Sequence, residues 1–258
     1  MNERIFPELE VSEVKNIASS FNAMLDRLES AFETEKRLVA DASHELKTPL
    51  SVINAQCDVL MQGESVDEKY AQALNRIKGA SKSMNRLIGD MLSLTRLDSG
   101  LLSAADFTSV SLYECIDNAL KFTEFLAKEK QVKIINKIPE DIHILGDRDM
   151  LSEVFLNIIE NGIKYNRAGG TVEITATKNT DSADVSIQDT GEGIREGDSE
   201  KIFNRFYRAD TSRSKEGTGL GLSIARAIIE SHGGRIQVKS GLDSGSCFIL
   251  TLPLKQHV

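Results

Sequence analysis

The stretch EGTGLGLSIA, residues 216–225, decides the fold of the C-terminal part of the chain. Three glycines at alternate positions run directly into an apolar-periodic segment that predicts a helix. Glycine lets the backbone come close to a ligand. A glycine-rich turn at the start of a helix also presents free N–H groups and the positive end of the helix dipole to an anion. The stretch therefore predicts a turn that holds a chain of phosphates.

A second glycine turn and a basic segment accompany this stretch. DTGEGI, residues 189–194, follows a predicted strand, and residues 201–215 between the two turns hold five basic side chains against one acidic. The sequence has no GxxxxGK[ST] P-loop, no complete GxGxxG dinucleotide pattern and no VAIK, HRD and DFG set of protein kinases. We interpret the combination as a phosphate site with a mobile lid. The alternative is two ordinary loops and a solvated basic face.

Polar residues on the preceding predicted helix support the first interpretation. Asn157, Asn161 and Lys164 are spaced i, i+4 and i+7, which places them on one helical face. Amide oxygens suit Mg²⁺, which prefers hard oxygen ligands, and a lysine suits phosphate. The alternative is a polar face exposed to solvent.

The totals exclude several classes of protein. The 258 residues include 31 Lys and Arg against 39 Asp and Glu, a net charge of −8, whereas a nucleic-acid partner needs a basic footprint. Widely spaced Cys57, Cys115 and Cys247 form no CxxC pair and indicate reduced core thiols. No apolar run reaches the roughly 20 residues of a membrane span, and the first ten residues are too polar for a signal peptide.

The first half of the chain is helical in pattern. Residues 12–98 have apolar side chains at three- and four-residue steps in two segments, joined by the polar stretch 61–69. This predicts a helical hairpin, which has too small a core to stand alone. Two hairpins would bury both apolar stripes in a four-helix bundle, so we predict a homodimer. The alternative is a hairpin packed on the rest of its own chain.

The second half mixes strands and helices. Strand patterns occur at 107–110, 132–138, 142–145, 171–178, 184–189, 235–240 and 247–254. Helices are predicted after Ser111 and Asp147, which are suited to N-caps, and up to Gly233 and Gly234. His232, at the end of the last helix, is expected to be an ordinary surface or packed residue, at a place where a cation suits the helix dipole. We expect an α+β sandwich, with an antiparallel sheet covered by helices on one face.

Five motifs resemble those of sensor histidine kinases. NIIENGIKYN, DTGEGI, IFNRFYR and GTGLGLSIA, in that order, are similar to the N, G1, F and G2 boxes of that family, and SHELKTPL, residues 43–50, is similar to its H box. VSEVKNIASSFNAMLDRLE, residues 11–29, resembles the second helix of a HAMP linker. The resemblance implies three parts: a HAMP remnant with a signalling helix at 1–30, a dimerisation and histidine phosphotransfer domain at 31–102, and a Bergerat-type ATP-binding domain at 103–258.

The resemblance also implies an activity. ATP would phosphorylate His44, and the phosphoryl group would pass to an aspartate in the receiver domain of a response regulator, with phosphatase activity on that regulator. The alternatives are a phosphatase-dominated signalling protein and a non-catalytic nucleotide-sensing scaffold. ATP and Mg²⁺ are the implied cofactors. The chain would be the cytoplasmic portion of an inner (plasma) membrane receptor, soluble by itself.

The H box supplies the expected catalytic residues. His44 Nε2 is a nucleophile when the ring is neutral, as much of an unperturbed histidine is near pH 7. Glu45 is the candidate general base and would bind Nδ1–H. By resemblance, Thr48 would position a water molecule for dephosphorylation of the partner. Lys47 would attract phosphate or an acidic partner surface.

The other boxes imply a nucleotide site. By resemblance, Asp189 would accept the adenine amino group, Asn161 would coordinate Mg²⁺, and Arg205 would lie near the γ-phosphate. Phe203 and Phe206 would anchor the lid. The further expected nucleotide-binding residues are Asn157, Lys164, Tyr165, Gly191, Gly193, Ile194, Gly217, Thr218, Gly219, Leu220, Gly221 and Leu222.

Overall fold

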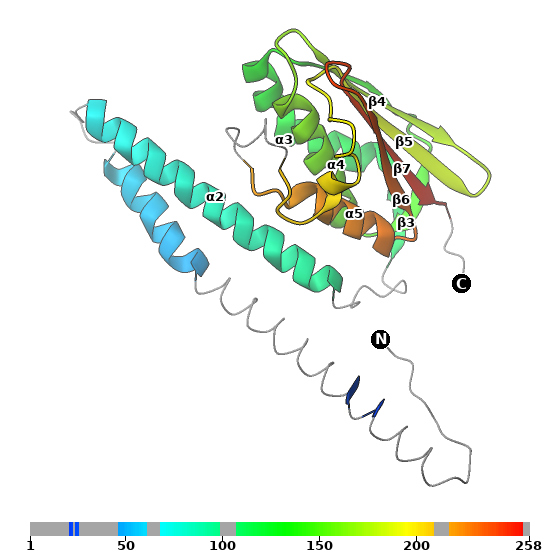
Figure 1. The fold of residues 1–258 in the computed structure, drawn as a ribbon, viewed down its shortest axis with the longest axis horizontal. Coiled ribbons are helices and arrows are strands. Elements are labelled where there is room, and N and C mark those ends of the chain that lie inside the picture. Colours follow the sequence, from blue (N-terminus) through cyan, green and yellow to red (C-terminus); the bar gives the residue numbers. More distant parts are fainter. Residues whose placement is uncertain are drawn as a thin grey trace.

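The computed structural model in Figure 1 describes residues 21–22, 24–25, 46–60, 68–98, 107–208 and 217–254. Residues 46–60 form a helix that lies beside α2 (Glu68–Asp98). Ser81 Oγ on α2 donates to the Leu50 carbonyl oxygen at 3.1 Å, and Lys78 forms an ion pair with Asp58 at 2.5 Å. The predicted hairpin is therefore confirmed. No helix in these ranges is long and apolar enough to cross a lipid bilayer.

The hairpin buries only part of its apolar surface. Leu50, Cys57, Ile88 and Leu94 are buried. Other large apolar side chains of the hairpin remain exposed, namely Leu46, Val52, Ile53, Val59, Leu60, Tyr70, Ile77 and Met84. Leu46, Ile53 and Leu60 follow one another at seven-residue steps, as do Tyr70, Ile77 and Met84, so each set lies along one face of its helix. Exposed apolar faces of this kind mark interaction sites.

In the C-terminal part, the described residues 107–208 and 217–254 form two sheets. The smaller pairs β1 (Thr108–Ser111) with β3 (His143–Gly146) in antiparallel register. The larger has the strand order β2-β4-β5-β7-β6. Its strands are β2 (Lys133–Lys137), β4 (Thr171–Lys178), β5 (Ser182–Asp189), β6 (Arg235–Ser240) and β7 (Ser246–Pro253).

The prediction of a purely antiparallel sheet was wrong. β4, β5, β7 and β6 pair antiparallel, but β2 pairs with β4 in parallel register. The chain between β2 and β4 includes the whole of α4, and parallel strands require such a long crossover instead of a tight hairpin. The predicted hairpin of β4 and β5 is confirmed, with Ile174 opposite Ile187.

Three helices cover one face of the larger sheet (Figure 1): α3 (Leu112–Lys130), α4 (Arg148–Lys164) and α5 (Gly221–Ser231). The predicted N-caps are confirmed. Asp147 Oδ1 accepts hydrogen bonds from the N–H groups of Asp149 and Met150 at 2.9 and 3.0 Å. Ser111 Oγ accepts a longer one, 3.4 Å, from Glu114. Such caps satisfy backbone donors that have no partner within the helix.

The core lies between the helices and the sheet. Its largest fully buried side chains include Phe155 and Ile158 from α4 and Ile174 and Ile187 from the sheet. Burying each side chain of this size stabilises the fold by about 1.5–3 kcal/mol. Leu94 of α2 belongs to the same core. The hairpin therefore does pack on the rest of its own chain, in addition to leaving an apolar face exposed.

His232 is a packed histidine, one of the two ordinary roles expected of it, and its ring is neutral at the end of α5. Only 1 % of its surface is exposed, and burial lowers the pKa of the ring. Nε2 accepts the Asp147 N–H at 3.0 Å, Nδ1 lies 2.7 Å from the Ile228 carbonyl oxygen, and the ring stacks on Phe107. An acceptor Nε2 leaves the proton on Nδ1. The thiols of Cys57 and Cys115 are buried as expected, and that of Cys247 is half-buried.

Candidate functional site

The polar face of α4 lies against the second glycine turn. We refer to residues 217–221 as the phosphate loop. A Cβ atom on Gly221 would lie 3.1 Å from Asn157 Oδ1, and one on Gly217 would lie 2.9 Å from Lys164 Nζ. Asn161 occupies the turn between Asn157 and Lys164 on the same helical face. The structure thus brings together a helix face and a loop that are more than fifty residues apart in sequence.

Asp189, the last residue of β5, is held in one orientation. Its Oδ1 accepts hydrogen bonds from the N–H groups of Gly191 at 2.8 Å and Ser246 at 3.2 Å. The residue is 8 % exposed. Burial raises the pKa of the carboxyl group, and the two backbone hydrogen bonds lower it. A fixed acceptor in a mostly buried place can select a ligand by hydrogen bonding.

The first glycine turn is clamped between two other segments. A Cβ atom on Gly191 would overlap the carbonyl oxygen of Tyr165, which also accepts the N–H of Glu192 at 3.1 Å. Gly193 has φ +70°, and a Cβ atom there would overlap the carbonyl oxygen of Gly241. The N–H of Ile194 donates to Ser240 Oγ at 2.8 Å. The turn therefore depends on backbone approaches that only glycine permits.

The two phenylalanines of the expected lid differ. Phe203, in the 3₁₀ helix η2 (Lys201–Phe203), is 7 % exposed and packs edge to face on Phe248. Arg226 lies over its ring at 5.5 Å. Phe206 has φ +60° and is 58 % exposed. Phe203 is anchored by burial, whereas the lid role expected of the exposed Phe206 stays a prediction.

Exposed Arg205 lies between these two phenylalanines. The backbone of the segment 203–208 approaches the phosphate loop at Phe206. A Cβ atom on Gly219 would lie 2.9 Å from the backbone carbon of Phe206. The rest of the predicted lid, residues 209–215, lies outside the described residues.

Sequence reasoning missed one contact of the phosphate loop. Thr218 Oγ1 donates a hydrogen bond to Asp90 Oδ2 of α2 at 2.7 Å. Leu220, which follows in the loop, is buried, and Leu222 is half-buried in the first turn of α5. An aspartate on the polar side of a helix carries no local signal of such a contact, because the pairing depends on how α2 docks.

The phosphoacceptor region is described only in part. His44 and Glu45 lie outside the described residues. Lys47 and Thr48 are exposed at the start of the helix 46–60. The predicted roles of these four residues therefore remain predictions.

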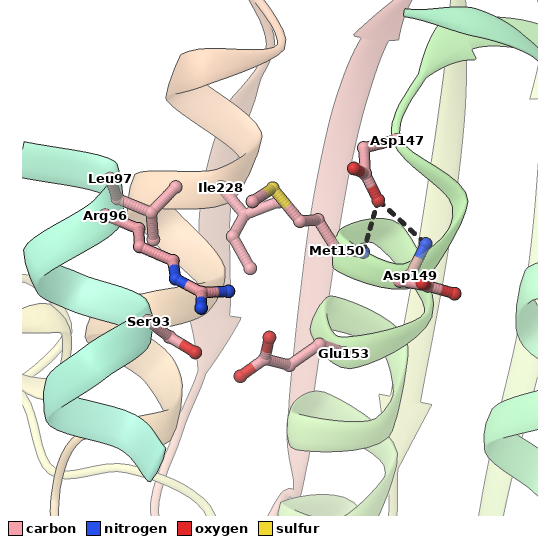
Figure 2. A pocket seen from close by; sticks show the side chains of 8 residues that line it. All are labelled: Ser93, Arg96, Leu97, Asp147, Asp149, Met150, Glu153 and Ile228. Atoms are coloured by element: carbon pink, nitrogen blue, oxygen red, sulfur yellow. Dashed lines mark hydrogen bonds between the residues drawn. The ribbon is translucent and has the colours of Figure 1, made fainter. Parts of the chain in front are cut away.

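A cavity of about 250 Å³ lies between α2 and the helices α4 and α5 (Figure 2). Its lining residues are Ser93, Arg96, Leu97, Asp147, Asp149, Met150, Glu153 and Ile228. Figure 2 shows Arg96 of α2 and Glu153 of α4 pointing toward one another. Burial, followed by the Asp90 carboxylate, raises the pKa of Glu153. None of the predicted nucleotide residues lines this cavity, which belongs to the seam between the hairpin and the C-terminal part.

Fold and site together define a class of protein. A buried aspartate at the end of a strand, a clamped glycine turn and a polar helix face against a phosphate loop are the features of a Bergerat-type ATP-binding domain. Residues 146–256 match the family "Histidine kinase-, DNA gyrase B-, and HSP90-like ATPase", and residues 34–100 match the "His Kinase A (phospho-acceptor) domain". The chain belongs to the sensor histidine kinases, and its ATP-binding domain carries the nucleotide motifs of that family.

Individual relatives agree with this assignment. The chain is 30 % identical over 259 residues to the signal transduction histidine-protein kinase BaeS of Escherichia coli, a match that covers 99 % of this chain and 54 % of BaeS. The catalytic domain of the histidine kinase ThkA is 30 % identical, with a TM-score of 0.52 over 58 % of this chain and 96 % of that domain. The chain spans about half the length of the curated relatives it matches.

A longer structure of ThkA shares the fold over nearly the whole chain. The histidine kinase ThkA in complex with the response regulator protein TrrA has a TM-score of 0.60 at 22 % identity, covering 96 % of this chain and 68 % of that one. The arrangement of a helical hairpin followed by an ATP-binding domain is thus also found in that kinase.

Proposed function

We propose that the chain is the kinase part of a sensor histidine kinase. It phosphorylates His44 with ATP and passes the phosphoryl group to an aspartate in the receiver domain of a response regulator. The observation that carries the proposal is the approach of Asn157 and Lys164 to the phosphate loop, in a chain whose hairpin bears the H box. Glycine loops and helix N-termini of this kind bind phosphate groups.

The packing of β1 and α3 bears on where the ATP-binding domain begins. The ATP-binding family match begins at residue 146. However, Val110, Leu112 and Ile116 of β1 and α3 lie in the same core as the matched region. This supports an ATP-binding domain that begins before residue 146, as the proposed limits of 103–258 require. The phosphotransfer domain of 31–102 and the HAMP remnant with a signalling helix at 1–30 are proposed from the sequence.

The residues present fit ATP. Asp189 offers a carboxylate of fixed orientation for the adenine amino group, next to a glycine turn whose close approaches leave no room for side chains. Tyr165 and Ile194 flank this turn, and Lys164 lies 5.5 Å over the Tyr165 ring. At the other end, Lys164 and the phosphate loop offer positive charge and backbone donors. The two ends of the site thus match the base and the phosphates of one ligand.

Mg²⁺ fits the same face of α4. Asn161 would hold the ion through its amide oxygen, a ligand type that Mg²⁺ accepts. Bound Mg²⁺ would offset negative charge on the phosphates. Lys164 and Arg205 would add to this, because phosphoryl transfer depends on positioning and charge stabilisation.

His44 carries out the transfer. Its neutral Nε2 forms a bond to the γ-phosphorus while the bond from that phosphorus to the bridging oxygen breaks, and ADP leaves. Glu45 accepts the Nδ1–H and stabilises the positive charge of the ring as Nε2 attacks. In the second step the N–P bond breaks and an aspartate oxygen of the regulator takes the phosphoryl group.

We also propose that the chain works as a homodimer. The exposed apolar side chains of the hairpin, among them Val52, Ile53, Val59 and Ile77, would be covered in a four-helix bundle made with a second hairpin. The observed packing of the hairpin on its own ATP-binding domain covers a different part of α2, around Leu94.

The same assignment implies a protein partner and a cellular location for the chain. The complex of ThkA with TrrA supports a response regulator as the partner of this chain. Thr48 and Lys47 are exposed, as a surface that receives a regulator requires. Similarity of residues 11–29 to a HAMP helix supports a membrane receptor as the parent protein, with this part in the cytoplasm.

A labelling experiment tests the function. The chain is incubated with Mg²⁺ and γ-labelled ATP, and acid-labile, base-stable label on the protein is counted. We expect label on the wild type, none on His44→Gln, and unchanged label on the control His143→Gln, which alters an exposed histidine of β3. Asn161→Asp should lose label because Mg–ATP binds poorly. Normal labelling of His44→Gln would contradict the assignment of the phosphoacceptor.

A comparison of two activities separates kinase from phosphatase. Thr48→Ala should keep the label on His44 but lose dephosphorylation of the regulator, since Thr48 would position the attacking water. If instead the wild type dephosphorylates the regulator and never labels His44, the phosphatase-dominated alternative holds.

A further inference from the structure

The helical hairpin touches the phosphate loop directly. Thr218 Oγ1 donates to Asp90 Oδ2 at 2.7 Å, and the N–H of Leu220 donates to the same Thr218 oxygen at 3.3 Å. Leu220 is fully buried and directly precedes α5. One hydroxyl group therefore links a carboxylate of the hairpin to the point where the loop becomes a helix.

Other contacts lie along the same stripe of α2. One turn before Asp90, Arg86 forms an ion pair with Glu160 of α4 at 3.1 Å. One turn after it, Leu94 is buried in the core of the ATP-binding domain. The cavity of Figure 2 continues the stripe with Ser93, Arg96 and Leu97. α2 thus contacts both α4 and the phosphate loop, the two elements that frame the nucleotide site.

Asp90 is half-buried and lies near charges of both signs. Burial raises the pKa of its carboxyl group and the Glu160 carboxylate raises it further, whereas the Thr218 hydroxyl and Arg86 lower it. Asp90 in turn raises the pKa of Glu153. A half-buried carboxylate costs free energy unless it is hydrogen-bonded. The Thr218 hydroxyl supplies that hydrogen bond, so the contact stabilises both Asp90 and the loop.

We propose that Asp90 is a positioning residue for the phosphate loop. Its carboxylate acts through the Thr218 hydroxyl and holds the loop in shape while the hairpin lies against the ATP-binding domain. The inference rests on the proposed kinase function. Its consequence is that the loop is ordered when the hairpin that carries the phosphoacceptor histidine is docked.

Kinetics of the full chain test this role. The rate of His44 phosphorylation is measured against ATP concentration for the wild type, Asp90→Ala and Asp90→Asn. Asp90→Ala should lower kcat about tenfold, because a hydrogen bond to a charged group is lost. The KM for ATP should change less than about threefold, since the adenine end at Asp189 is untouched. Asp90→Asn keeps an acceptor for Thr218 and should retain at least about half of the wild-type kcat.

Two further variants show whether Asp90 acts through Thr218. Arg86→Ala removes another contact of the same seam without touching the loop, and kcat should stay within about twofold, as for other exposed ion pairs. Thr218→Val removes the donor. The double variant Asp90→Ala/Thr218→Val should be no slower than the slower single variant, because both remove the same bond. The proposal is overturned if the kcat losses of the two single variants multiply in the double variant. It is also overturned if Arg86→Ala lowers kcat as much as Asp90→Ala does.

Hydrogen exchange tests the positioning apart from catalysis. Without nucleotide, backbone N–H groups of residues 219–222 should exchange about tenfold faster in Asp90→Ala than in the wild type, and Asp90→Asn should protect them. Amides in the middle of α4 serve as the internal control and should not change. A wild type that never labels His44 would contradict the proposed function, while the exchange rates would still decide the role of Asp90. If the N–H groups of residues 219–222 exchange at the same rate in Asp90→Ala as in the wild type, the positioning role of Asp90 is overturned.

Discussion

Replacing Gly193 by alanine should destabilise the ATP-binding domain far more than the same change at Gly197. Both glycines have left-handed backbones, with φ +70° and +85°. A Cβ atom on Gly197 meets nothing within 4 Å, whereas one on Gly193 would overlap the Gly241 carbonyl oxygen and lie 2.9 Å from its carbon. The pair therefore separates the cost of the backbone conformation from the cost of the close approach.

The free-energy cost of each substitution follows from the part of the structure that the new Cβ atom displaces. Alanine in the left-handed region costs about 1–2 kcal/mol, and Gly197→Ala should lose only this. Gly193→Ala must also push back the 241–245 turn, which is tied by the Asp243 N–H to the Glu192 carbonyl at 2.9 Å and by Ser240 Oγ to the Gly245 carbonyl at 2.7 Å. Weakening two hydrogen bonds of about 1 kcal/mol each gives a total of about 3–4 kcal/mol for Gly193→Ala.

Urea unfolding measures the difference. The chain has no tryptophan, so far-UV circular dichroism is the suitable signal. Nucleotide is left out, because a bound ligand would stabilise the variants unequally. With a slope of about 2 kcal/mol per molar urea, the midpoint of Gly193→Ala should lie about 1 M below that of Gly197→Ala. Equal midpoints for the two variants would refute the claim that the turn is clamped by Gly241.

Two further predictions concern the start of α4 and the end of α5. The pKa of His232 is lowered from its ordinary value of 6.5, chiefly by burial, so the unfolded chain takes up a proton before the folded one. Stability should thus be complete above about pH 6.5 and fall as the pH drops through the folded pKa. His232→Gln should flatten this acid-side loss in urea midpoints measured from pH 7.5 to 5, and the exposed control His143→Gln should not. Asp147→Ala should cost about 1 kcal/mol of unfolding free energy through loss of the N-cap. Ser111→Ala, whose cap bond is longer at 3.4 Å, should cost less in the same assay, and the reverse order would contradict the cap geometry.

Much of the secondary structure was predictable because its signals are local. Asp147 and Ser111 cap helices through groups two or three residues away, and over most of their length β4 and β5 alternate buried and half-buried side chains. The same holds for the spacing of Asn157, Asn161 and Lys164 on one helical turn after another. These patterns act over a few residues and can be read before the chain is folded.

Features that depend on long-range docking were not predictable. The parallel pairing of β2 with β4 and the separate sheet of β1 and β3 depend on how α4 crosses between strands. His232 is neutral because burial and stacking on Phe107 remove it from water, which no neighbour in sequence indicates.

The sequence by itself determined the family, the caps, the two glycine turns and the polar face of α4. Tertiary structure alone decided that Gly193 is pressed against Gly241 and that Asp90 reaches Thr218 across 128 residues. The physical reason is that side-chain type and spacing set what a segment can do, while the packing of distant segments sets which groups lose water and which partners they find.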